Sequence, residues 1–272
     1  MDNPMYGYEA GGKDEESCSV EMGEEEAIVV QGLTVDTVDE VDNANPHIAY
    51  HGGLSSEEMK YQEMGFVGAP KVLLADHMKK MRTWLLRIRR MAEAHERHAE
   101  GVYSATNESL HHAILRTLIC DDDSMTFPAS RKTLIDLDLC TFEALCSSEL
   151  EMQMPSASLI SRVAGISEIE LRLKSQRAYG LIARRTKGRQ FAMSKGGLIM
   201  IVPSQAKTGD VIVVFRGARV PYLLRPVPGI RERKYTLIGE AYVHGIMQGE
   251  CFPESPDIAS LGHCESETFC IA

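Results

Sequence analysis

Five short runs of β-branched, aromatic and other apolar residues fill the segment from residue 189 to residue 243. In chain order they read RQFAM (189–193), LIMIV (198–202), VIVVF (211–215), PYLLR (221–225) and YTLIGEAYV (235–243). Glycine or proline lies between neighbouring runs, which is typical of strands joined by tight turns. Because closure removes exposed sheet edges, we expect a five-stranded antiparallel barrel-like sheet within residues 181–252.

The segment before these runs has the periodicity of helices. From Pro70 onward, apolar side chains recur every three or four residues beside Trp84, and basic side chains occupy much of the remaining surface; the apolar positions are Leu74, Met78, Met81, Leu85 and Ile88. A shorter helix is predicted over 108–118, capped by Asn107. Further helices are predicted over 130–147 and 156–179, the last ending at Gly180.

The two ends of the chain have a different composition. Residues 1–26 hold nine acids and one base, which accounts for −8 of the net charge of −10, and such a self-repelling segment predicts a disordered acidic tail. Residues 27–36 read as a strand, and the polar segment 253–272 predicts an irregular C-terminal tail. We therefore expect an α+β protein, with a strand and a helical region over 27–180 packed on the β module of 181–252.

Composition also argues against several classes of protein. No stretch approaches the roughly 18 apolar residues of a membrane span, and the N-terminus lacks a secretory signal, so we expect a cytoplasmic chain without a membrane span. An acidic chain is a poor partner for nucleic acid. The seven cysteines form no CxxC pair, and no metal-binding, P-loop or GxSxG motif occurs, so we expect neither a metal nor a cofactor.

One long stretch resembles a known family. The run LIGEAYVHGIMQGE (237–250) is similar to the region that follows the effector domain in fungal heterokaryon-incompatibility (HET) proteins, and weaker similarity extends over about 27–252; the supporting stretches are QGLTVDTV (31–38), LRTL (115–118), GRQF (188–191) through GDVIV (209–213), and PYLLR (221–225). The effector domain of that family has no counterpart in this sequence. The resemblance implies no catalytic residues, so candidates rest on chemistry.

The candidate catalytic residues are Glu240, Tyr242 and His244. Alternate residues of an extended strand point the same way, so these three proton-transfer groups are predicted to share one face. A second interpretation stays open, in which Tyr242 is a core aromatic whose hydroxyl is satisfied by His244.

The candidate substrate-binding residues are two aromatic and two basic side chains. Trp84 and Tyr235 are predicted to be pocket walls, and Arg225 presents a planar fork of donors that suits a carbonyl or carboxylate. Arg116 lies on a mostly apolar helix and needs a partner if it is buried, for which Asp36 and Glu240 are the candidates.

Two functions remain open on these observations. The first is a cofactor-independent enzyme of fungal secondary metabolism that cyclises or isomerises an apolar small molecule, for example by an intramolecular Diels-Alder addition. Holding two reacting ends together can supply about 7–11 kcal/mol, and one donor to a carbonyl adds to that. The alternative is a non-enzymatic recognition or regulatory module that binds a HET-like protein partner.

Overall fold

The structure is a computed structural model that describes residues 10–11, 21–22, 27–42, 44–45, 71–98, 100–121, 167, 178, 180–229, 234–251 and 266–272. The chain divides into two compact units, which we call the barrel unit (Met1–Val41 with Phe191–Ala272) and the helical unit (Asp42–Gln190). The N-terminal strand, which was predicted to group with the helices over 27–180, belongs to the barrel unit in the structure. The predicted helix over 130–147, and nearly all of that over 156–179, lie outside the described residues.

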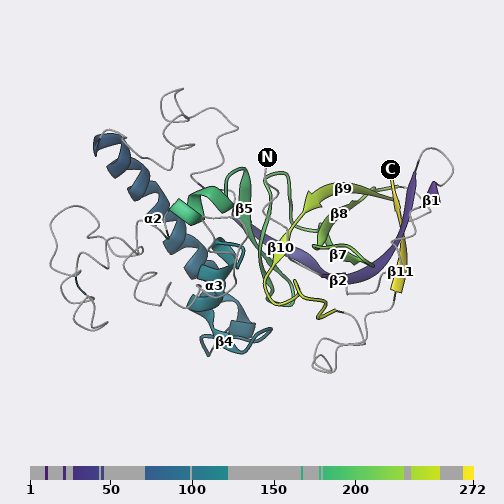
Figure 1. Cartoon of the computed structure of the whole chain (residues 1–272), viewed down its shortest axis with the longest axis horizontal. Helices are drawn as coiled ribbons and strands as arrows, with labels where there is room; N and C mark the ends of the chain where they lie inside the picture. Colours follow the sequence, from purple (N-terminus) through teal and green to yellow (C-terminus); the bar gives the residue numbers. More distant parts are fainter. Residues whose placement is uncertain are drawn as a thin grey trace. The chain divides into compact units, whose positions relative to one another are not determined.

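Five strands close the barrel (Figure 1): β2 (Ile28–Asp42), β7 (Val211–Phe215), β8 (Tyr222–Pro226), β9 (Lys234–Glu240) and β11 (Ser266–Ile271). β7, β8 and β9 form an antiparallel meander, β9 pairs with β11 in parallel, and β11 pairs with β2 antiparallel. The β2–β7 pair closes the circle. The barrel-like α+β architecture is thus consistent with the prediction, although one of its strand pairs is parallel.

The strands of the barrel differ from the five predicted runs. Only three of those runs enter the circle, because β5 (Arg189–Ser194) and β6 (Ile199–Pro203) form a branch with β10 (Tyr242–Val243) in the order β10-β6-β5-β2. The predicted strand over 235–243 is divided at Ala241, since β9 pairs with β8 whereas β10 pairs with β6. The remaining two places in the barrel are taken by the ends of the chain, β2 and β11.

The barrel core explains why β11 belongs to it. Phe269 of β11 is fully buried and its ring contacts those of Phe215 and Tyr235, with centroids 5.9 Å and 5.5 Å apart. The other core side chains come from β2, β7 and β8: Val30, Val213 and Leu224. The prediction of an irregular tail over 253–272 is therefore wrong for residues 266–271, whose single large aromatic fills the interior.

The N-terminal segment also contacts the barrel unit. β1 (Glu21–Met22) pairs antiparallel with Ile28 and Val29 of β2, and Ala10 and Gly11 are buried against the turn that follows β7. At these described positions the prediction of a disordered tail that buries nothing is wrong.

The described part of the helical unit follows the sequence pattern more closely. It contains α2 (Lys71–Ala94), η2 (Glu96–His98), β3 (Val102–Tyr103), β4 (Glu108–Ser109) and α3 (Leu110–Leu118). The predicted apolar face of α2 is confirmed where side chains are described, because Met81, Trp84, Leu85 and Ile88 are all buried.

The predicted helix ends need correction. Ser109, rather than Asn107, caps α3 by accepting a hydrogen bond from the backbone of His112. Asn107 instead has a φ of 55° in the turn between β3 and β4, and Gly180 is helical. Within the described ranges we find no helix that is both long and apolar enough to cross a membrane.

Candidate functional site

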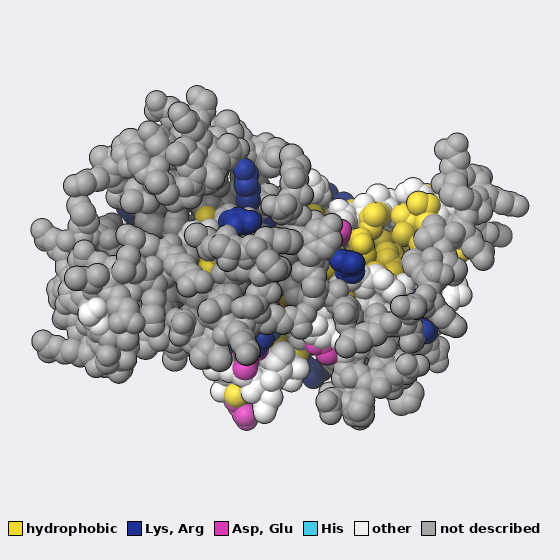
Figure 2. Space-filling model, in the orientation of Figure 1, with side chains coloured by type: hydrophobic (Ala, Val, Ile, Leu, Met, Phe, Trp, Pro, Cys, Tyr) yellow, Lys and Arg dark blue, Asp and Glu magenta, His cyan; other side chains and the backbone are white. Residues whose placement is uncertain are grey.

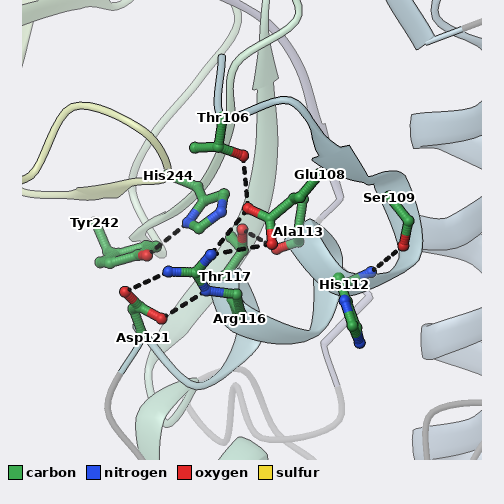
Figure 3. Close-up of polar contacts among 10 residues, drawn as sticks. All are labelled: Thr106, Glu108, Ser109, His112, Ala113, Arg116, Thr117, Asp121, Tyr242 and His244. Atoms are coloured by element: carbon green, nitrogen blue, oxygen red, sulfur yellow. Dashed lines mark hydrogen bonds and ion pairs between the residues drawn. The ribbon is translucent and has the colours of Figure 1, made fainter. Parts of the chain in front are cut away.

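Tyr242 and His244 form a buried pair in the barrel unit (Figure 3). The Tyr242 hydroxyl and Nδ1 of His244 lie 2.8 Å apart in a hydrogen bond, and the two side chains are 1% and 2% exposed. β10 places Tyr242 opposite Ile201 of β6, and the backbone N–H of His244 donates to the carbonyl of Ile199 at 3.0 Å. The pair is therefore anchored on β6 and buried.

Glu240 does not continue this pair along one strand. It ends β9, opposite Tyr222 of β8, and is half-buried, whereas Tyr242 begins the pairing with β6. The alternation that predicted a shared face requires one uninterrupted strand, and the chain leaves β9 at Ala241. Of the three candidate catalytic residues, Tyr242 and His244 are thus in contact, and Glu240 pairs with a different strand.

Arg225 is held by one buried carboxylate. Its Nε and Nη2 donate to the two carboxylate oxygens of Asp210 at 2.8 and 2.9 Å, and Nη2 also donates to the carbonyl of Gln205. The hydrogen bond with Asp210 raises the pKa of Arg225 above its usual value, against a smaller lowering by desolvation. Asp210 also accepts the backbone N–H of Lys207, so the ion pair fastens the loop between β6 and β7 onto β8.

Arg116 is held by two carboxylates in the helical unit (Figure 3). Its Nε and Nη2 donate to Asp121 at 2.8 and 2.9 Å, and its Nη1 donates to both oxygens of Glu108 at 3.0 Å. The bonds to Asp121 are the main cause that raises its pKa, while burial opposes them. The predicted partners Asp36 and Glu240 are wrong, since Asp36 accepts the N–H groups of Thr37 and Gly196 instead.

The two aromatic candidates occupy the cores of different units. Trp84 lies on the buried face of α2, and its Nε1 has no hydrogen-bond partner in the described part of the chain. Tyr235 packs in the barrel core against Phe269. Both side chains therefore contribute to the packing of their own unit.

Sequence reasoning missed the carboxylates that engage both arginines. Glu108 and Asp121 bracket α3 eight residues before and five residues after Arg116, a spacing that a search for local ion pairs could have found. Asp210 lies in the loop before β7, and no local signal in the sequence links it to Arg225 on β8. Among the described residues, no group of three His, Cys, Asp or Glu side chains is placed to hold a metal ion.

Comparison with known proteins places this region in context. Residues 164–255 match the family model described as the Het-6 beta-barrel domain. This confirms the resemblance to HET proteins. The matched range contains β5 to β10 but neither β2 nor β11, the two strands that complete the barrel.

A curated relative gives the same indication at a local level. Heterokaryon incompatibility protein 6, OR allele, of Neurospora crassa is 40% identical over 72 residues, which are 26% of this chain and 11% of that protein. The match thus spans about a tenth of the relative's length. No solved structure matches.

Proposed function

We propose that this chain is a non-enzymatic recognition module that binds a HET-like protein partner through its barrel unit. The observation that carries the choice is the burial of Tyr242 and His244, because their 1% and 2% exposure leaves no described approach for a substrate carbonyl. The donors of Arg225 and Arg116 are likewise occupied by carboxylates of the same chain.

An exposed apolar side chain on β9 suggests where a partner binds. Leu237 is 46% exposed, and alternation along the strand points it the same way as Tyr235, which is 8% exposed and lies in the barrel core. Leu237 is therefore an exposed apolar side chain on the same side of β9 as the barrel core. Figure 2 shows hydrophobic side chains gathered on the surface over the barrel strands. A contiguous apolar surface of this kind favours an interaction site.

The proposal is tested by binding of the full chain to the Neurospora relative named above. Replacing Leu237 with Asp puts a charge at the centre of the expected contact and should weaken binding by about tenfold or more. Thr236→Asp is the matched control, because Thr236 is exposed on the same strand but points to the opposite face. Unchanged affinity of Leu237→Asp, or no binding by the wild-type chain, would overturn this assignment.

A second candidate, the cofactor-independent cyclase, is favoured by one specific observation. The 2.8 Å bond between Tyr242 and His244 is the arrangement in which an imidazole orients a phenol for donation to a carbonyl. Under this proposal Tyr242→Phe slows turnover by about 10²–10³, since one catalytic donor is lost.

The recognition proposal predicts a different outcome for Tyr242→Phe. Deleting a structural hydroxyl removes one hydrogen bond from the buried His244, so the melting temperature falls and the cost is roughly 1–3 kcal/mol of stability. The measurements are thermal unfolding and turnover of any metabolite that accumulates when the gene is deleted. Lower melting with unchanged turnover, or no accumulated metabolite, removes the cyclase from consideration.

A further inference from the structure

The turn that follows β7 holds two residues of the N-terminal segment through backbone atoms. The N–H of Ala10 donates to the carbonyl of Arg219 at 3.1 Å, and the N–H of Gly11 donates to the carbonyl of Ala218 at 2.7 Å. In return, the N–H of Gly217 donates to the carbonyl of Gly11 at 3.1 Å. Ala10 and Gly11 lie in a turn of the chain and are both buried, so a short peptide is bound with hardly any side chain.

The position of Gly11 accepts glycine alone. A Cβ atom added there would lie 2.4 Å from the N atom of Ala218 and 2.6 Å from the carbonyl oxygens of Ala218 and Phe215. These are backbone atoms, which cannot rotate away as the end of a side chain can. Any larger residue must therefore move the peptide off the turn, and with it the three hydrogen bonds.

The receiving turn is ordered by bonds that do not involve the N-terminal segment. The N–H of Ala218 donates to Phe215 at 3.0 Å, and the N–H of Arg216 donates to Gln31 of β2 at 3.1 Å. The Ala218 side chain packs against the barrel core. A binding surface that is already formed by its own unit costs little ordering when a peptide docks on it.

We propose that the turn over residues 215–219 is a glycine-selective docking site for a short Ala-Gly segment. In this structure the chain's own Ala10–Gly11 occupies it, and the same segment of a second copy can occupy it in exchange. Main-chain hydrogen bonds supply the affinity, and the lack of room for a Cβ atom supplies the selectivity. The inference goes beyond the proposed function, because it concerns a different surface from that of Leu237.

The test uses the full chain carrying Gly11→Ala, a change that displaces the chain's own Ala10–Gly11 segment from the site. The binding probe is a fluorescent peptide with the sequence of residues 6–15, YGYEAGGKDE. We expect the peptide to bind this variant at least about tenfold more tightly than the wild type, in which a tethered segment competes at a high effective concentration. Gly180→Ala is the control chain, since a Cβ at Gly180 meets nothing within 4 Å. It should bind as weakly as the wild type.

Selectivity is read from a second peptide in which the glycine corresponding to Gly11 is alanine. Equal binding of both peptides, or no binding of the first to the Gly11→Ala chain, overturns the proposal. If that variant does not fold, amide hydrogen exchange on the wild-type chain decides, because the N–H groups of Gly11 and Gly217 must be protected and free exchange at both contradicts the docking. Leu237→Asp should leave peptide binding unchanged, so failure here and failure of the proposed function are distinguishable.

Discussion

The barrel and the stretch from α2 to α3 differ in how far apart along the chain their contacting residues lie. In the barrel, Val30 of β2 lies opposite Phe269 of β11, so segments near the two ends of the sequence meet. Between Lys71 and Leu118, α2 contacts η2 and α3, and β3 contacts β4, so these contacts stay within one stretch of the chain. The comparison teaches that this helical stretch follows from local pattern, whereas the barrel depends on pairing between remote segments.

The two arginine clusters repeat this contrast on a smaller scale. Arg116 is paired with two carboxylates, both within eight residues of it, whereas Arg225 is paired with the single buried carboxylate of Asp210 in the loop before β7. Redundant partners should make the first cluster tolerant of substitution and the second sensitive to it.

The largest effect is expected where remote segments meet. Phe269→Ala removes the fully buried aromatic that β11 contributes to the barrel, and it should lower the free energy of unfolding by roughly 3–5 kcal/mol. The control is Thr268→Ala on the same strand. Because Thr268 is exposed, this change should alter the free energy of unfolding by no more than about 0.5 kcal/mol. Denaturant unfolding measures both, and equal small effects would mean that β11 does not hold the barrel closed.

The next effect is expected at Asp210. Asp210→Asn keeps the shape of the side chain but removes the negative charge that pairs with Arg225. The guanidinium of Arg225 then loses its ion pair with this buried position. The expected cost is roughly 1.5–3 kcal/mol in chemical denaturation. Asp39→Asn, an exposed position on β2, serves as the control and should be nearly neutral.

Asp121→Asn provides the matching change in the helical unit. Arg116 keeps both bonds from Nη1 to Glu108, so the loss should be smaller, about 1 kcal/mol. The same unfolding assay compares it with Asp210→Asn. A cost as large as that of Asp210→Asn would break the distinction between one carboxylate and two.

The smallest effect is a dependence on pH at Glu93. Burial raises the pKa of this carboxyl, but its hydrogen bonds with Arg89 and His111 outweigh that and hold the pKa below its ordinary value of 4.5. The folded state therefore gains stability above the unfolded pKa and loses it as the pH falls through the folded pKa. Because Glu93 is 43% exposed, the gain is at most about 1 kcal/mol.

Glu93→Gln tests this sign directly. The variant should melt below the wild type at pH 7, and the difference should shrink as the pH is lowered below about 4.5 and through the lowered folded-state pKa of Glu93. Melting curves across that range measure it. A difference that grows on acidification would contradict the proposed role of the carboxylate.

Several features of the site were accessible from the sequence and several were not. The sequence predicted that Tyr242 and His244 share one face of a strand, but β10 ends at Val243 and His244 lies in the turn that follows. The buried face of α2 followed from its spacing. Glu240 separated from that pair because β9 and β10 join different partners at Ala241, and nothing local announces a change of partner. Arg116 was expected to need a carboxylate, but the sequence could not choose among distant acids.

By itself, the sequence determined which segments become strands and helices wherever the spacing of apolar residues repeats over a long enough stretch. It also contained the run over residues 237–250 that resembles HET proteins. Only the tertiary structure decided which strands form the barrel. Backbone hydrogen bonds pair any two extended segments alike, so the choice depends on which side chains fill the shared interior. Phe269 fills that interior from the C-terminal part of the chain. Gly11, in the N-terminal part, contacts the turn after β7 closely because glycine has no Cβ atom to clash with the backbone there.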